Sequence, residues 1–280
     1  MSTAASRKGL LRLMNTGTKR LEDQAVKDLK KILTTLTRRA RGRVRKREVG
    51  SLDFTKKFAT FIQRVMVVQH LQGLVNTRRV YNHVVKSLDF YSDTSRALAR
   101  ILQINSGPIM DAYEASAFRV AEEFGDHINR ELAEHVNSLI DQQLPTTKMV
   151  ESLQEKFDAL GITPRNSFAL ENIVRTQSQL AFNAGKYIGE QDPAFQEILW
   201  GYEYTTVGDN RVREEHAVLE GVTLPKNDPF WRQFYPPNGW SCRCAVIPVF
   251  DEPDDIKNPP VDFEVDERFL FNPGEFLLNQ

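Results

Sequence analysis

Apolar residues recur three and four positions apart over long stretches of the chain, which is the spacing of one helix face. One such stretch runs from Phe54 to Leu71. A second runs from Ile109 to Leu139 and is bracketed by Pro108 and Pro145, residues that are common just inside and just beyond a helix. We predict one helix over each stretch, the second of about ten turns. Because helices of this length pair with neighbours, we expect a hairpin or bundle.

The pattern changes in the second half of the chain. A third helix is predicted over Thr147–Leu160, and a fourth follows Thr163-Pro164. After Gly189, apolar and polar residues alternate around Ile198–Tyr204, which predicts a strand. Further on, a short helix is predicted over Arg211–Leu219 and a strand over Cys242–Val249. The fold class expected is α+β, with long N-terminal helices followed by a compact C-terminal domain that contains a small sheet.

Charge divides the chain further, although the net charge is zero. Residues 1–47 hold fifteen Lys and Arg against three acidic residues, whereas residues 251–280 hold nine acidic residues against two basic ones. Each end should therefore select different partners. We expect four segments: a basic, partly helical arm (1–50), a long-helix region (51–163), a compact domain (164–250) and an acidic C-terminal tail (251–280).

Cysteine usage and hydropathy bear on the compartment. Cys242 and Cys244 are the only cysteines, and their spacing disfavours a bond between them within a strand. Reducing conditions therefore fit better than a secreted, disulfide-linked domain. No segment approaches the ~18 apolar residues of a transmembrane helix, and the basic N-terminus lacks the apolar core of a signal peptide. A soluble, intracellular protein without membrane contact is expected.

A block between Glu171 and Pro248 carries the most specific signal. It contains Arg175-Thr176 with Asn183 and Gly185 on one helix, then a strand with Trp200, Tyr202 and Tyr204. Next come Asp209-x-Arg211-x-Arg213-x-x-His216-x-x-Leu219-x-Gly221 and, last, Cys242-Arg243-Cys244. In this order and spacing the block resembles the phage head morphogenesis family, the Mu F-like minor head proteins. Phe271-Asn272-Pro273-Gly274 is similar to a short tail motif of that family. The resemblance covers roughly the C-terminal 40% of the chain.

The resemblance implies a minor capsid protein of a tailed bacteriophage that acts in head assembly and DNA delivery. The partners it implies are the portal protein, the major capsid protein and packaged double-stranded DNA, bound without sequence specificity. The location it implies is the virion, at the portal vertex or in the capsid interior, and the host cytoplasm during assembly.

Three side chains of the block are typical metal ligands. His216, Cys242 and Cys244 are of the kind that hold zinc, and Asp209 is a candidate fourth ligand of a structural site. The alternative is that the cysteines are small buried residues and that His216 bonds to the strand. Either way, these residues are expected to hold the C-terminal domain together.

Two sets of polar residues remain. Arg175, Asn183, Arg211 and Arg213 are expected to form a polar network, with Arg213 reaching a carboxylate such as Glu171 or Glu203. The alternative for Arg211 and Arg213 is that they bind phosphate or a carboxylate of a partner. A run of seven cationic side chains in ten residues is the candidate contact with DNA phosphates or with an acidic partner surface; its members are Arg38, Arg39, Arg41, Arg43, Arg45, Lys46 and Arg47. No aromatic residue interrupts this run, so base readout is not indicated.

Enzymatic activity is not indicated by any familiar signature, because the chain has no Gly-x-Ser-x-Gly, phosphate-binding loop or His-Glu-x-x-His sequence. Three alternatives to a structural protein stay open. The first is a metal-dependent nuclease or hydrolase with Glu214 or Glu215 as base. The second is a cysteine nucleophile activated by His216. The third is a non-specific DNA-binding protein.

Overall fold

The structure is a computed structural model that describes residues 18–48, 52, 54–85, 108–142, 145–163, 165–260 and 263–279. Part of the predicted basic arm, residues 1–17 and 49–50, lies outside these ranges. Within them, the structure has no helix that is both long enough and apolar enough to cross a membrane.

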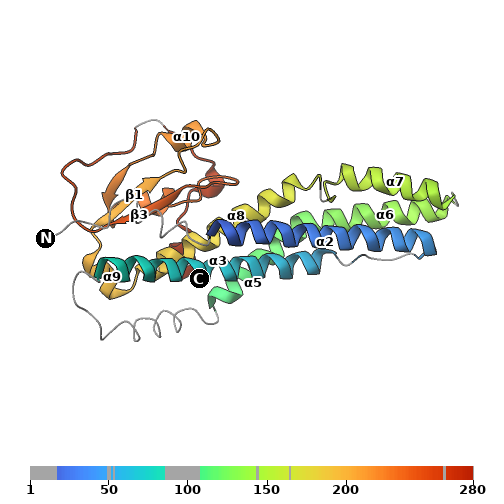
Figure 1. The fold of residues 1–280 in the computed structure, drawn as a ribbon, viewed down its shortest axis with the longest axis horizontal. Helices are drawn as coiled ribbons and strands as arrows, with labels where there is room; N and C mark the ends of the chain where they lie inside the picture. Colours follow the sequence, from blue (N-terminus) through green and yellow to red (C-terminus); the bar gives the residue numbers. More distant parts are fainter. Residues whose placement is uncertain are drawn as a thin grey trace. The chain divides into compact units, whose positions relative to one another are not determined.

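Helices dominate the first 198 residues (Figure 1). They are α2 (Thr18–Lys46), α3 (Phe54–Val85), α5 (Pro108–Ala121), the π-helical segment η1 (Glu122–Asp126), α6 (His127–Asp141), α7 (Thr146–Ala159), α8 (Phe168–Glu190) and α9 (Pro193–Ile198). The C-terminal part contains β1 (Gly201–Thr205), α10 (Glu214–Ala217), β2 (Thr223–Pro225), α11 (Phe230–Phe234), β3 (Ala245–Val249), η2 (Glu267–Phe269) and α12 (Pro273–Leu278). The expected α+β class, with long helices preceding a small sheet, is confirmed.

The described chain forms two compact units, and each is built from separated pieces of sequence. One unit, here called the helical unit, combines Glu22–Val65 with Tyr113–Arg175. The other, here called the sheet unit, contains the part of α3 from Met66 onward and the chain from Thr176 onward. The expected segment boundaries near residues 50 and 163 therefore fall inside the helical unit.

In the helical unit, each helix buries one apolar stripe. On α2 the stripe consists of Leu29, Leu33, Leu36, Ala40 and Val44, so the segment expected as an arm is a packed helix over its described part. On α6 it consists of Ile128, Leu132, Val136 and Leu139, and on α7 of Met149, Leu153 and Phe157. Polar contacts join α6 to α7: Lys156 pairs with Glu131 at 2.9 Å, and His135 lies 3.2 Å from the Ser152 hydroxyl.

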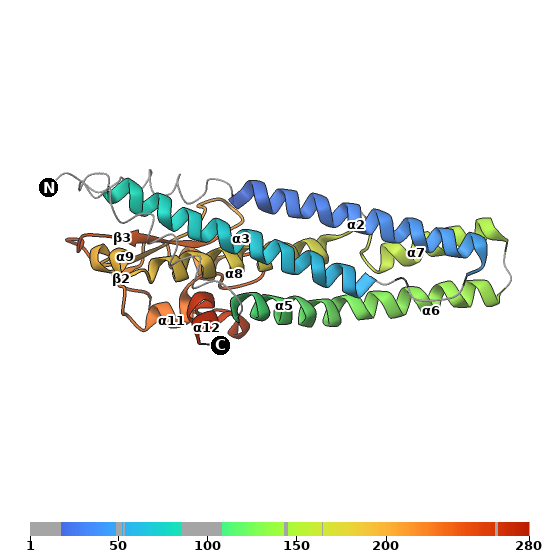
Figure 2. The same cartoon turned by 90° about the horizontal axis from the view of Figure 1, so that it is seen from below.

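The sheet unit centres on a three-stranded antiparallel sheet in the order β2-β1-β3. Figure 2 labels its outer strands, β2 and β3. Tyr202 pairs with Leu224 on one side and with Pro248 on the other. The side chains of Tyr202, Tyr204 and Trp231 are buried in one apolar core. These aromatic residues thus pack the core of the sheet unit.

Helices α3 and α8 cross at very short distance within the sheet unit. A Cβ atom built on Gly185 would lie 2.1 Å from the carbonyl oxygen of His70, and one built on Gly73 would lie 2.2 Å from that of Phe182. Only glycine allows backbones to approach this closely. Gly185, which belongs to the family-like block, is therefore a packing residue.

A buried ion pair lies one helical turn beyond this crossing. Lys186 donates to Glu190, and both side chains are almost completely inaccessible to solvent. The Tyr235 hydroxyl completes the cluster by donating to Glu190 at 3.2 Å. Burial lowers the pKa of Lys186 and raises the pKa of Glu190, while their mutual attraction opposes both shifts.

The end of the acidic C-terminal segment packs within the sheet unit, whereas residues 251–258 are mostly exposed. The Asn272 side chain caps α12 by accepting from the amides of Gly274 and Glu275, and it donates to the Trp231 carbonyl at 3.2 Å. Phe269 and Leu277 are buried. The Phe-Asn-Pro-Gly motif is thus a helix start that anchors this segment.

Candidate functional site

The predicted metal ligands come from two elements of the sheet unit. His216 is the buried residue of the short helix α10, and Cys242 and Cys244 lie in the loop before β3. The strand expected from Cys242 begins only at Ala245. The reason is a sharp turn at Ser241, whose φ of 50° lies in the left-handed region. The Ser241 amide donates to the Thr176 hydroxyl of α8 at 2.9 Å, which ties this turn to the helix.

The structure brings the three side chains together. The His216 Nδ1 atom lies 3.7 Å from the Cys242 sulfur and 3.6 Å from the Cys244 sulfur. All three ligand atoms lie within 4.8 Å of one another, and all three side chains are buried. Among the described residues, this is the one group of His, Cys, Asp or Glu side chains whose geometry could hold a metal ion.

The orientation of the imidazole is fixed from its other side. His216 Nε2 lies 3.2 Å from the Asn238 carbonyl oxygen, which can only accept a hydrogen bond. Nε2 therefore carries a proton, and Nδ1 faces the sulfurs. A ligating histidine that donates its second N–H to a carbonyl is the usual outer support of a metal site. The Asn238 side chain in turn accepts from the Tyr204 hydroxyl at 2.8 Å.

The electrostatics of the cluster favour one deprotonated sulfur. A hydrogen bond from Cys244, followed in importance by one from His216, holds the pKa of Cys242 well below its usual value despite burial. The same contact with Cys242, together with burial, raises the pKa of Cys244. Burial would lower the pKa of His216, but its contact with Cys242 outweighs this and raises it. The Cys242 thiolate is the form of cysteine that binds metals.

Asp209, the candidate fourth ligand, is placed elsewhere. Its carboxylate accepts both guanidinium nitrogens of Arg243 at 2.7 Å, and it also accepts from the Arg211 amide at 3.0 Å. Arg243, the residue between the two cysteines, thus points away from the sulfurs and binds Asp209 instead. The Asp209–Arg243 pair braces the cysteine loop from its outer side.

The four residues expected as one polar network have separate partners. Arg175 pairs with Glu22 within the helical unit, whereas Asn183 donates to the Pro236 carbonyl at 2.9 Å. Arg213 is exposed and donates to the Trp240 carbonyl at 2.6 Å, so it does not reach Glu171 or Glu203. Its nearest carboxylate is Glu215, at 3.9 Å.

Two supports of the cysteine loop were missed by the sequence analysis. Gln179 of α8 donates to the Cys244 carbonyl at 3.2 Å, and Asn238 holds His216 as described above. Asn238 follows a Pro-Pro pair and precedes Gly239, a turn sequence that could have marked it. Gln179 gives no such signal, because a buried glutamine in a helix looks like an ordinary surface residue in sequence.

The carboxylates considered as a catalytic base lie on the outside of α10. Glu214 and Glu215 are exposed, whereas His216 on the same helix is buried. Glu215 is 3.9 Å from Arg213 rather than beside the sulfurs. Neither of these two carboxylates is therefore placed as a base beside the ligand cluster.

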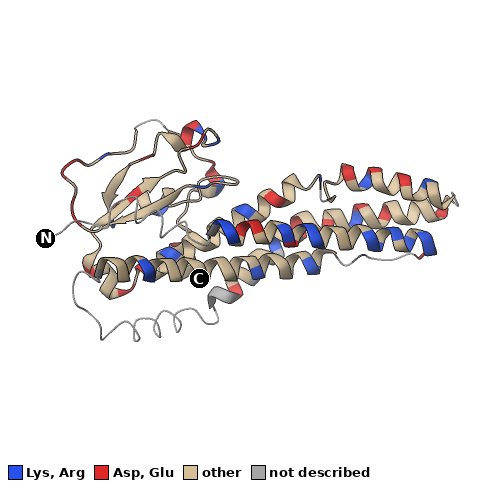
Figure 3. Cartoon of the chain, viewed as in Figure 1, with Lys and Arg blue, Asp and Glu red and all other residues tan. Residues whose placement is uncertain are grey.

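The basic run lies at the C-terminal end of α2 (Figure 3). Arg38, Arg39 and Arg45 are exposed, as expected of a contact surface. Arg41 is not available in the same way, because it donates to Gln154 and lies over the Phe157 ring, 5.5 Å from its centre. Lys46 faces Glu48 at 3.9 Å.

Residues 134–247 match the profile of the family described as Phage Mu protein F like protein, so this part of the chain is similar to the Mu F-like proteins. The matched region begins some way before residue 164, where the sequence analysis placed the domain, and it includes α7.

Individual relatives agree with this assignment. The chain is 39% identical to the putative capsid assembly protein F of Escherichia phage Mu over 77 residues, which is 28% of this chain and 17% of that protein. It is 36% identical to the Mu-like prophage FluMu F protein of Haemophilus influenzae over 77 residues, 28% of this chain and 18% of that protein. An uncharacterized protein of Haemophilus influenzae is 24% identical over 193 residues, 68% of this chain and 41% of that protein. The match thus spans less than a fifth of either F protein, and no solved structure matches the chain.

Proposed function

We propose that the protein is a minor capsid protein that acts in head morphogenesis of a tailed bacteriophage. The observation that carries this proposal is the match of residues 134–247 to the Mu F-like family, whose phage Mu relative is named a putative capsid assembly protein. We further propose that it binds the portal protein or the major capsid protein and remains in the virion, at the portal vertex or in the capsid interior, near packaged DNA.

Co-expression tests the assembly role. The protein would be produced with the portal and major capsid proteins of the same phage, and assembled heads would be separated by sedimentation. The protein should co-sediment with heads at low copy number and should bind isolated portal protein. A protein that stays entirely in the unassembled fraction, although it is folded by circular dichroism, would refute the assignment.

The His216–Cys242–Cys244 cluster is proposed to hold a structural zinc ion. Zinc bonds of roughly 2.3 Å to sulfur and roughly 2.0 Å to nitrogen, at tetrahedral angles, place these ligand atoms roughly 3.6 Å apart. The two nitrogen–sulfur distances of 3.7 and 3.6 Å fit this spacing. When bound, the ion would link α10 to the start of β3, and the outer contacts from Asn238 and Gln179 would keep the ligands in place.

Elemental analysis of the full chain tests the zinc proposal. We expect one zinc per chain, lost in His216→Ala together with a lower melting temperature. His83→Ala is the matched control, because His83 is an exposed histidine of α3 outside the cluster. A wild-type chain without bound metal after refolding in excess zinc would leave the cysteines as packing residues.

A metal-dependent hydrolase or nuclease is the second candidate function. The supporting observation is that the cluster offers only three protein ligands within the described residues, and catalytic zinc sites keep a fourth position for water. The same His216→Ala variant separates the two functions. An enzyme would lose hydrolysis of a DNA substrate and keep its melting temperature, whereas a structural site would lose stability.

A further inference from the structure

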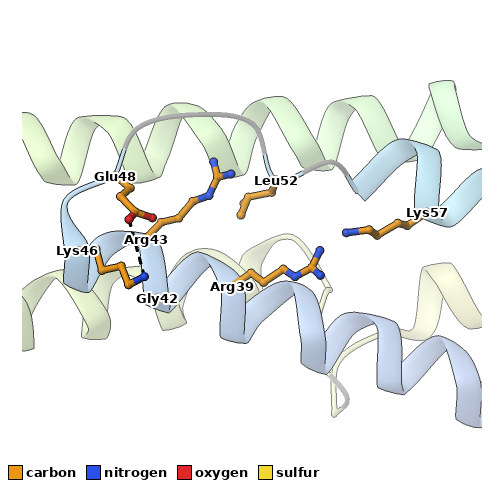
Figure 4. A pocket seen from close by; sticks show the side chains of 7 residues that line it. All are labelled: Arg39, Gly42, Arg43, Lys46, Glu48, Leu52 and Lys57. Carbon is orange, nitrogen blue, oxygen red and sulfur yellow. Dashed lines mark ion pairs between the residues drawn. The ribbon is translucent and has the colours of Figure 1, made fainter.

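A cationic hollow lies in the helical unit where α2 ends and α3 begins (Figure 4). Its volume is about 370 Å³. It is lined by Arg39, Gly42, Arg43, Lys46, Glu48, Leu52 and Lys57. Arg39 and Arg43 project from α2, while Lys57 reaches toward it from α3, so cations from two helices converge on one space.

The charge of this hollow is not balanced from within. Its one acidic residue, Glu48, pairs with Lys46 at 3.9 Å. No ion pair involving Arg39, Arg43 or Lys57 occurs in the described part of the chain. Three like charges that converge without an ion pair to any described acidic residue repel one another and create a positive potential that attracts anions.

One of the three cations also has an unmet hydrogen-bonding requirement. The Nη1 atom of Arg43 is buried and has no acceptor in the structure. A buried charged donor without a partner is costly, so such groups normally meet an acceptor or ligand. Arg41, two residues earlier, also has a buried Nε atom without an acceptor, but its guanidinium donates to Gln154 and lies over the Phe157 ring, so Arg41 is held inside the unit.

We propose that this hollow is a phosphate-binding pocket that receives the sugar-phosphate backbone of DNA. Arg39, Arg43 and Lys57 would contact phosphate oxygens, and Leu52 offers an apolar contact to the sugar. The open space at Gly42, where an added Cβ would meet no atom within 4 Å, leaves room for the backbone to enter. Arg38 and Arg45 lie exposed on the same helix and extend the positive surface beyond the pocket. The choice of DNA over an acidic protein rests on the proposed role in a phage head.

The pocket differs from the basic run because it depends on Lys57, which belongs to another helix. The matched pair Lys57→Gln and Lys56→Gln therefore tests it. Both lysines are exposed and adjacent on α3, but only Lys57 lines the hollow. Binding of the full chain to a labelled 20-base-pair duplex would be measured by fluorescence anisotropy over a range of salt concentrations, with folding checked by circular dichroism.

The wild-type chain and Lys56→Gln should bind the duplex equally. For Lys57→Gln we expect a several-fold loss of affinity at low salt and a fall of about one in the slope of log affinity against log salt, the effect of one lost phosphate contact. Arg39→Gln should behave like Lys57→Gln. Equal effects of the two lysine variants would overturn the pocket and leave only diffuse attraction.

Competition identifies the class of anion. With both competitors expressed as the concentration of negative charges, unlabelled duplex should displace the labelled duplex at a lower concentration than poly-glutamate does. The opposite order would assign the hollow to an acidic protein and overturn the proposal. Failure of the chain to join heads would refute the proposed function without altering these binding curves, so the two failures are distinguishable.

Discussion

Alanine at Gly185 should destabilise the protein, although alanine is the better helix former. The added Cβ would lie 2.1 Å from the His70 carbonyl oxygen and 2.8 Å from its carbonyl carbon, and backbone atoms cannot rotate away as a side chain can. Overpacking of this kind costs about 1–3 kcal/mol, and backbone contact places it at the upper end. The higher helix propensity of alanine relative to glycine offsets about 1 kcal/mol of this cost. The expected net loss in the free energy of unfolding is about 2 kcal/mol.

Two other glycines of helices provide a graded control. At Gly189 the nearest atom to an added Cβ is the Thr77 Cβ, at 3.1 Å, so Thr77 has to move by only a few tenths of an ångström, far less than the His70 backbone would have to move at Gly185. At Gly42 nothing lies within 4 Å. Gly189→Ala should therefore change stability little, and Gly42→Ala should raise it by about 1 kcal/mol.

Urea denaturation followed by far-ultraviolet circular dichroism measures all three variants. The expected order of stability is Gly42→Ala above wild type, then Gly189→Ala, then Gly185→Ala. A Gly185→Ala protein that is as stable as wild type, with an unchanged dependence on urea, would refute the close crossing of α3 and α8.

Three further predictions concern polar contacts. Lys186→Met leaves Glu190 buried without its partner and should lower the free energy of unfolding by about 3–5 kcal/mol, measured by urea denaturation. Replacing Lys186 by Met and Glu190 by Leu together should lower it clearly less, and equal losses would contradict the coupling of the two side chains. Arg243 holds the pKa of Asp209 well below its usual value of 3.8, so the stability that this pair contributes is present above pH 3.8 and is lost as the pH falls through the lowered pKa. Arg243→Gln should raise the pKa of Asp209 toward 3.8, measured by carbon NMR titration. An unchanged pKa would exclude the pair. Asn272→Ala removes the cap of α12 and should lower the free energy of unfolding by about 1 kcal/mol, measured by urea denaturation. An unchanged free energy of unfolding would contradict the capping role of Asn272.

Hydrophobic periodicity predicted the helices well where their buried faces are apolar. The helix expected over Thr147–Leu160 is α7, Thr146–Ala159, and the stretch from Pro108 is helical with a π-helical turn at Glu122–Asp126. The helix that was traced to Leu71 continues to Val85. Its second half buries the polar side chains of His70 and Thr77 where it meets α8, so the residues stay buried although the apolar pattern fades.

Short elements escaped prediction for a different reason. β2 has three residues and α11 five, which is too few for any periodicity to register. Residues Pro193–Ile198, next to the predicted strand, form the helical turn α9, because Asp192 caps it and Pro193 occupies its first position.

The candidate metal ligands were recognisable from the sequence because His and Cys are the side chains that typically bind zinc. The residues that hold these ligands in place were not recognisable. Asp209 has the right chemistry for a ligand, and only the structure reveals that Arg243 binds it. Arg243 stands between the two cysteines in sequence, but the direction of its side chain follows from the left-handed turn at Ser241. Glycine is the usual sequence signal for such a turn, and this position holds a serine instead.

The interleaving of the two units has a consequence for synthesis on the ribosome. Met66 emerges ~110 residues before Thr176, so at about 5–20 residues per second the second half of α3 waits roughly 5 to 20 seconds for α8. During that interval His70, Gly73 and Thr77 lack the α8 residues that they contact in the folded protein, and this face of α3 is open to chaperones or to other nascent chains. A fragment that begins at residue 164 would meet the reverse difficulty, because its α8 would never receive α3.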